Sequence, residues 1–79
     1  MKVERYNGWT NWDTWNAFTL LTNDSRTYNY MRERAKQPGF KHEVVLSLGM
    51  LAFDLNLGQN SLPNVENINY FELKRALTE

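Results

Sequence analysis

His42 is the side chain in this sequence best suited to general acid–base chemistry or metal binding near neutral pH. It is the single histidine, and the sequence contains no cysteine. Catalysis requires a second reactive group within hydrogen-bonding reach, and a metal ion requires several ligands. Glu43 and Asp54 are eleven residues apart, about three helical turns, too far to share one ion with His42. We therefore predict no catalytic residue, no metal site and no cofactor.

A basic group is the best candidate for contact with nucleic acid. Two tyrosines, Tyr28 and Tyr30, interleave with its cations, as in proteins that stack bases of a single strand on aromatic rings. The alternative is a solvated helix face with its cations near the negative end of the helix dipole. The whole chain has a formal net charge of zero, which favours the second interpretation. The cations of the group are Arg26, Arg32, Arg34, Lys36 and Lys41.

All three tryptophans lie within nine residues, in the stretch Gly8-Trp9-Thr10-Asn11-Trp12-Asp13-Thr14-Trp15-Asn16. Because tryptophans are the largest apolar side chains, we expect the core to form against them. The alternative is that one of them, Trp9 above all, is an exposed anchor for a partner, since tryptophan is common at interface hot spots.

Composition narrows the class of protein. Residues 1–41 contain seven Lys or Arg and four Asp or Glu, whereas residues 42–79 contain two and five, so the neutral chain is positive in one half and negative in the other. Neutrality argues against a nucleic-acid mimic and against a general nucleic-acid binder. No apolar run approaches the roughly 20 residues of a membrane span, and Met1–Tyr6 has no apolar segment typical of a signal peptide. We expect a cytoplasmic protein without membrane contact.

The elements that would position these residues are helices, and we predict an all-α fold, a compact bundle of three longer helices and a short C-terminal one. Apolar periodicity and capping residues place them at 11–22, 24–36, 41–57 and 69–77, within one domain spanning 1–79. Residues 1–8 form an arm, docked through Val3 or Tyr6, and residues 58–68 form a loop. The expected N-caps are Thr10 or Asn11 for the first helix, Asp24 for the second and Asn69, together with Glu72, for the last. Gly58 would end the third helix.

Two motifs resemble those of a family of small uncharacterised proteins from bacteriophages, cyanobacteria and mobile elements. The first is Asn7 to Asn16, which is similar to the pattern Asn-Gly-Trp-x-Asn, an aromatic, an acid and Thr-Trp-Asn; Asn23-Asp24 follows it. The second is Ile68-Asn69-Tyr70-Phe71-Glu72-Leu73, similar to Val-Asn-Trp-x-Glu-Ile with Tyr70 in place of tryptophan. The resemblance implies a phage-like origin and a small accessory protein acting on a host component. It brings no established activity.

These observations predict a non-enzymatic protein–protein interaction module, and together with the resemblance they predict a phage-type modulator or inhibitor of a host protein or defence system in the host cytoplasm. A homodimer is a variant of this prediction. The alternative function is a small nucleic-acid-binding accessory protein. The residues predicted to bind the partner are Trp9, Trp12, Arg32, Arg34 and Lys36.

Overall fold

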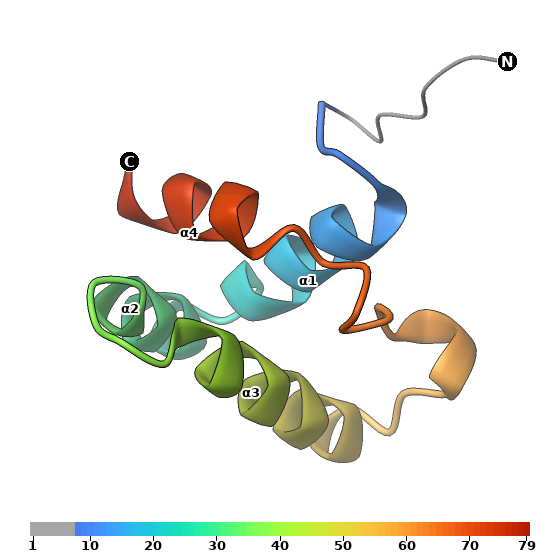
Figure 1. Cartoon of the computed structure of the whole chain (residues 1–79). Coiled ribbons are helices and arrows are strands. Elements are labelled where there is room, and N and C mark those ends of the chain that lie inside the picture. The colour runs from blue at the N-terminus through green and yellow to red at the C-terminus, as the bar shows by residue number, and fades with distance from the viewer. Residues whose placement is uncertain (1–7) are drawn as a thin grey trace, which may run out of the picture.

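The computed structural model describes residues 8–79, apart from the side chain of Gln59. The predicted docking of Val3 or Tyr6 lies outside the described residues. Within these described residues the chain forms four α-helices and one short 3-10 helix (Figure 1). Their bounds are α1 Trp12–Thr22, α2 Ser25–Arg34, α3 Phe40–Asp54, η1 Gln59–Ser61 and α4 Tyr70–Thr78.

The prediction of an all-α bundle is confirmed, because residues 8–79 fold into helices joined by short turns and one longer loop. The helix α1 is central and contacts α2, α3 and α4, while α2 also contacts α3 and α4 (Figure 1). None of the helices in the described part has the length and apolarity needed to cross a bilayer.

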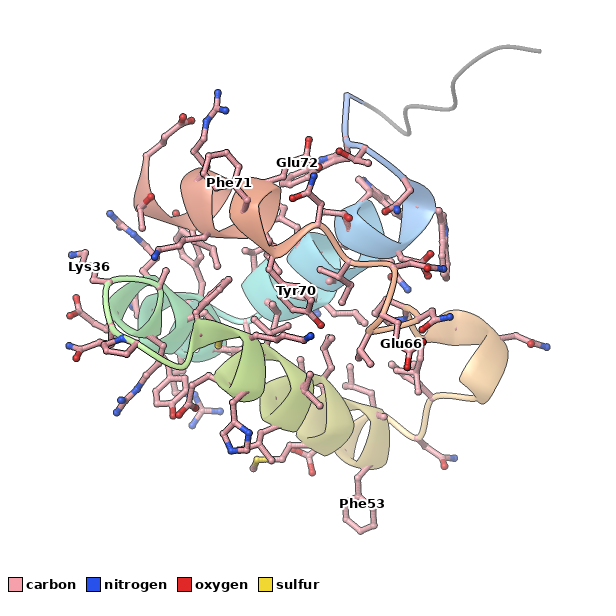
Figure 2. The ribbon with its side chains drawn as sticks, viewed as in Figure 1. Lys36, Phe53, Glu66, Tyr70, Phe71 and Glu72 are labelled. Carbon is pink, nitrogen blue, oxygen red and sulfur yellow. The ribbon has the colours of Figure 1, made fainter. Side chains whose placement is uncertain are left out.

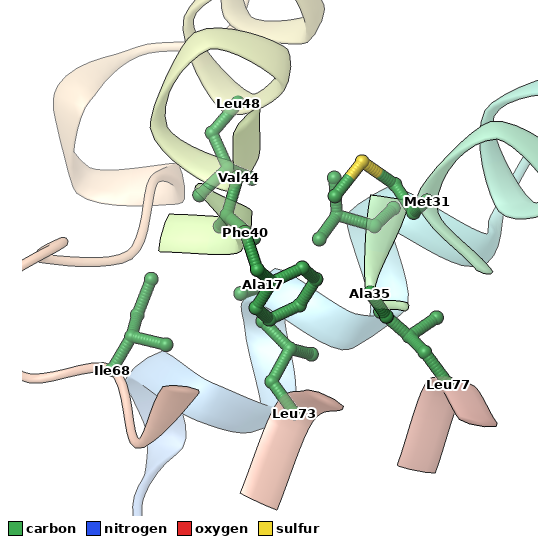
Figure 3. Close-up of a cluster of buried hydrophobic side chains, with 10 residues drawn as sticks. Ala17, Met31, Ala35, Phe40, Val44, Leu48, Ile68, Leu73 and Leu77 are labelled. Atoms are coloured by element: carbon green, nitrogen blue, oxygen red, sulfur yellow. The ribbon is translucent and has the colours of Figure 1, made fainter. Parts of the chain in front are cut away.

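The hydrophobic core is built from aliphatic side chains, one phenylalanine and one methionine, contributed by all four helices (Figure 3). No tryptophan belongs to it, so the expectation of a core formed against the tryptophans is wrong. On α1 the side facing the other helices holds Ala17 and Leu21, both fully buried, and the tryptophans lie outside this side. The core residues are Ala17, Leu21, Met31, Ala35, Phe40, Val44, Leu48, Ile68, Leu73 and Leu77.

Asn11, the second of the two predicted candidates, caps α1. Its side-chain oxygen accepts a hydrogen bond from the Thr14 amide at 2.9 Å, which satisfies one of the free amides of the first turn. The capping box expected if Thr10 were the cap is therefore absent. Asp13 contacts the loop that precedes α4 instead of the start of its own helix.

The second helix begins as predicted, because Asp24 caps it by accepting from the Arg26 amide at 3.2 Å. Tyr28, Met31 and Ala35 form an apolar stripe that faces the core, with Met31 and Ala35 fully buried. The helix ends at Arg34, two residues before the predicted Lys36.

The third helix is shorter than predicted at its C-terminal end. It begins at Phe40 after Gly39, which has a positive φ of 85° and no side-chain cap. It ends at Asp54 because Asn56, with φ 55°, adopts the left-handed conformation that we predicted for Gly58. The Asn56 and Leu57 amides bond the carbonyls of Phe53 and Ala52, the pattern of a Schellman motif.

The predicted cap of α4 is confirmed, since the Asn69 side chain accepts from the Glu72 amide at 3.0 Å. Ile68 and Leu73 are both buried, as expected for a hydrophobic staple. The reciprocal half of the capping box is absent, because the Glu72 carboxylate accepts from the Thr10 amide at 3.0 Å.

Candidate functional site

The polar residues of the first motif hold the C-terminal segment of the chain. The hydroxyl of Thr14, which is fully buried, donates to Asn11 Oδ1 at 2.7 Å and accepts from the Asn69 amide at 2.9 Å. Asn11 Nδ2 donates to the Asn67 carbonyl at 2.8 Å. The caps of α1 and α4 are thus joined through one threonine hydroxyl.

Two further residues of the motif hold the loop between α3 and α4. Asp13 Oδ1 accepts from the Asn64 amide at 2.8 Å, and Asp13 Oδ2 accepts from Asn67 Nδ2 at 3.4 Å. Asn16 is buried and donates from Nδ2 to the Ser61 carbonyl at 2.9 Å. We call Asn11, Asp13, Thr14 and Asn16 the clamp, since their contacts fix the loop and α4 to α1. These polar residues are therefore explained by folding.

The three tryptophans occupy intermediate or exposed positions. Trp9 is half-buried, with its ring 4.8 Å from the ring of Phe18 and tilted by 37°. Trp12 is 37% exposed, and Trp15 is half-buried. Trp9 therefore packs on α1 and keeps part of its side chain exposed.

The basic group contacts tyrosines and carboxylates within the chain. The Arg32 guanidinium lies 5.6 Å from the ring centre of Tyr28, and that of Arg34 lies 5.1 Å from Tyr30. The Lys36 ammonium lies 3.7 Å from a Glu33 carboxylate oxygen. Because arginines occupy faces of both tyrosine rings, these rings are poorly placed to stack on bases. The nucleic-acid interpretation stays a prediction.

The residues predicted to bind a partner do not form one surface. Lys36 lies at the end of the molecule remote from the start of α1, where Trp12 begins the helix (Figures 1 and 2). The basic residues and the tryptophans would therefore need to contact separate parts of a partner.

Among the described residues, the side chains suited to acid–base catalysis or metal binding do not come together in one site. His42 is exposed at the start of α3, and the neighbouring Glu43 carboxylate accepts a hydrogen bond from the Tyr30 hydroxyl at 2.8 Å. This hydrogen bond raises the pKa of Tyr30. Among residues 8–79, no group of three or more His, Cys, Asp or Glu side chains lies close enough to hold a metal ion.

An exposed apolar surface runs along α3, on the side turned away from the core. Leu46, Met50 and Phe53 are 50%, 67% and 87% exposed, respectively. Figure 2 shows Phe53 pointing away from the body of the molecule. With Val45 and Gly49 they line a shallow hollow that ends at Asp54. We call Val45, Leu46, Gly49, Met50 and Phe53 the α3 face.

The α3 face continues into a groove between α2 and α3. Leu46, Met50 and Leu51 supply the apolar lining of this groove, and Asp24 and Asp54 lie among its charged residues. An apolar strip bordered by charged groups is typical of a surface that binds another protein.

The sequence did not point to this surface, because apolar residues occur on more than one side of α3. The structure buries Val44 and Leu48 but leaves Val45 and Leu55 exposed. Four-residue steps from Phe40 to Val44 to Leu48 define the inward side. The steps Leu46, Met50 and Phe53 define a second apolar stripe, and this pattern was available in the sequence.

Gly49 does not serve the close approach of another helix within residues 8–79. It is exposed, and a Cβ atom at this position would meet no atom within 4 Å. Its place on the α3 face leaves a notch between larger side chains.

Comparison with models of known protein families finds a match over most of the chain. The model of a family of unknown function, DUF7249, matches residues 2–61. This range contains the first motif and the α3 face, whereas the second motif lies beyond it. Comparison with curated proteins and with solved structures yields no match.

Proposed function

We propose that this chain, which belongs to the DUF7249 family of unknown function, is a non-enzymatic protein–protein interaction module that docks through the α3 face. The observation that supports this proposal is the exposure of Leu46, Met50 and Phe53 side by side on one helix. Single exposed apolar residues are normal, but a contiguous exposed strip on a small domain is typical of a binding surface.

The α3 face is a better docking surface than the residues that the sequence pointed to. Arg34 and Lys36 have intramolecular partners, and Trp9 is partly covered by Phe18. Phe53 and Met50 are the more exposed side chains, so docking would remove more apolar area from water there than at Trp12.

The finer proposal, a phage-type modulator or inhibitor of a host protein, rests on the resemblance of the two motifs to small phage and mobile-element proteins. A short, neutral chain without a metal-binding cluster in its described part suits an accessory role in which binding itself is the activity.

Replacing Phe53 by glutamate should abolish partner binding while leaving the fold intact. A charge placed on the α3 face must be desolvated when the face is covered, whereas in the free protein it stays in water. The measurement is affinity capture from a lysate of the source cells, with quantitative mass spectrometry of the retained proteins. We expect at least one protein retained by the wild type to be lost with Phe53→Glu.

Phe71→Glu is the matched control, because Phe71 is also an exposed aromatic, at 71%, but lies on α4. The free energy of unfolding of both variants should lie within about 0.5 kcal/mol of the wild-type value, because both positions are exposed. Equal retention of every captured protein by wild type and Phe53→Glu, with no self-association of the chain, would contradict the proposed function.

A further inference from the structure

We infer that the occupant of the α3 face is the α3 face of a second copy of this chain, with the two helices packed antiparallel. This inference rests on the proposed function, since it names the partner of that surface. It follows from the spacing of the exposed residues, from their shape and from the charges at the ends of the helix.

The spacing is that of a helix with two packing sides. Phe40, Val44 and Leu48 pack into the core of the chain. On the exposed side, His42, Leu46, Gly49 and Phe53 follow one another at steps of four, three and four residues, the repeat of a helix–helix seam. A helix that is apolar on two sides is normally covered on both. Within residues 8–79 the second side of α3 stays exposed.

The shape of the α3 face is complementary to itself. Gly49 leaves a notch, while Met50 beside it is 67% exposed and projects as a knob. A two-fold axis crossing α3 between these two residues places Met50 of each copy over Gly49 of the other. The same axis places Phe53 of one copy against Leu46 of the other. Each large side chain then meets a smaller one, which close packing requires.

The charges favour the antiparallel arrangement over the parallel one. Antiparallel packing brings Asp54, at the end of α3, within about one helical turn of His42 in the second copy. It also places the negative end of each helix dipole beside the positive end of the other. Parallel packing would put the two Asp54 carboxylates side by side. The net charge of zero means that two copies do not repel each other as wholes.

A basic peptide in the groove between α2 and α3 is a weaker candidate for the occupant. Two of the three acidic residues of the groove, Asp24 and Glu43, already have partners in the chain. Asp24 lies 3.6 Å from the Arg26 guanidinium, and Glu43 accepts a hydrogen bond from Tyr30. An apolar, self-complementary surface remains, and this suits a second copy.

Sedimentation equilibrium tests the inference with the full chain. We expect the wild type to dimerise with a dissociation constant on the order of 10 μM, because one helix from each copy buries less than the roughly 1,200 Å² of a stable interface. Phe53→Glu should weaken dimerisation at least about tenfold. Phe71→Glu should leave it unchanged. A monomeric wild type at millimolar concentration, or a dimer unaffected by Phe53→Glu, would overturn the inference.

Disulfide trapping tests the antiparallel register, because the native chain has no cysteine and single substitutions are unambiguous. Gly49→Cys lies at the two-fold axis and should form a covalent dimer under mild oxidation at concentrations where the wild type associates. Asp54→Cys lies between four and five residues beyond the axis on each copy, which separates it from its mate by roughly 13 Å along the helix, and should not. Efficient trapping of Asp54→Cys, or failure of Gly49→Cys to trap in a solution of dimers, would overturn the antiparallel arrangement.

Different results would contradict the two proposals, docking through the α3 face and self-association through it. If the wild type is monomeric but a captured protein is lost specifically with Phe53→Glu, the self-association is wrong and the docking function of the α3 face stands. If neither self-association nor capture depends on Phe53, the docking function fails as well.

Discussion

Replacing Leu73 by alanine should lower the free energy of unfolding by about 2–5 kcal/mol. Leu73 is fully buried and lies among side chains of the other helices in the core (Figure 3). Its truncation removes apolar burial and leaves a cavity that the surrounding helices fill only in part. Such a loss is a large share of the total stability of a small domain. Urea unfolding followed by far-ultraviolet circular dichroism measures it.

Phe71→Ala is the control for this prediction, since Phe71 lies on the same helix but is 71% exposed. It should change the free energy of unfolding by no more than about 0.5 kcal/mol. Trp12→Ala should also cost less than Leu73→Ala, because the tryptophan lies outside the core cluster. A larger loss for Trp12→Ala would restore the tryptophan-centred core that the sequence suggested.

Replacing Thr14 by valine should destabilise the fold by about 2–3 kcal/mol. Valine keeps the shape of the side chain but removes the hydroxyl that accepts from the Asn69 amide and donates to Asn11. The Asn69 amide then loses its partner at a half-buried position beside the fully buried Thr14, and an unsatisfied donor shielded from water costs more than a hydrogen bond contributes. Urea unfolding of the variant gives the loss directly.

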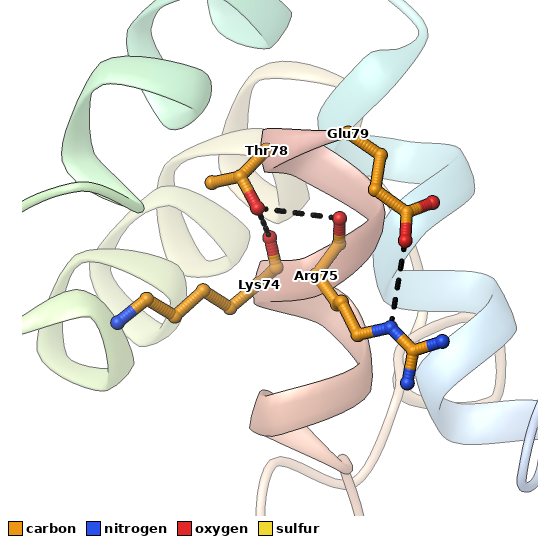
Figure 4. Close-up of polar contacts among 4 residues, drawn as sticks. All are labelled: Lys74, Arg75, Thr78 and Glu79. Atoms are coloured by element: carbon orange, nitrogen blue, oxygen red, sulfur yellow. Dashed lines mark hydrogen bonds and ion pairs between the residues drawn. The ribbon is translucent and has the colours of Figure 1, made fainter.

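Thr78→Val is the matched control. The Thr78 hydroxyl donates to the Lys74 and Arg75 carbonyls near the exposed end of α4, beside the contact between Arg75 and Glu79 (Figure 4). Water can replace these contacts, so the loss should stay within about 0.5 kcal/mol. Equal losses at Thr14 and Thr78 would show that the clamp contributes no special stability.

The sequence predicted those features of the fold that depend on neighbouring residues. Asp24 and Asn69 cap their helices by accepting hydrogen bonds from amides two or three residues farther along the chain. The order of residue types in the sequence is therefore enough to identify these caps. The partner of Asp13 is the Asn64 amide, 51 residues along the chain, and no local pattern indicates it. For this reason the sequence does not predict this contact of Asp13.

The candidate site was predicted less well than the fold, because it too depends on contacts between residues that are distant in the sequence. Large aromatic side chains suggested where burial and binding should occur, but burial depends on which side of a helix meets its neighbours. Met31, an ordinary residue in the sequence, is fully buried, whereas Phe53 is 87% exposed. Which of the two apolar sides of α3 packs inward is set by Phe40 and Val44 meeting the other helices, a tertiary choice that periodicity does not decide.

The most direct test of the α3 face is an assigned amide nuclear magnetic resonance spectrum of the isotope-labelled chain, followed from dilute to concentrated solution. We expect concentration-dependent shifts confined to the amides of α3 from Val45 to Asp54, with the amide signals of the clamp residues unchanged. Shifts centred on Trp9 and Trp12, or on Arg32 to Lys36, with α3 unchanged, would contradict it.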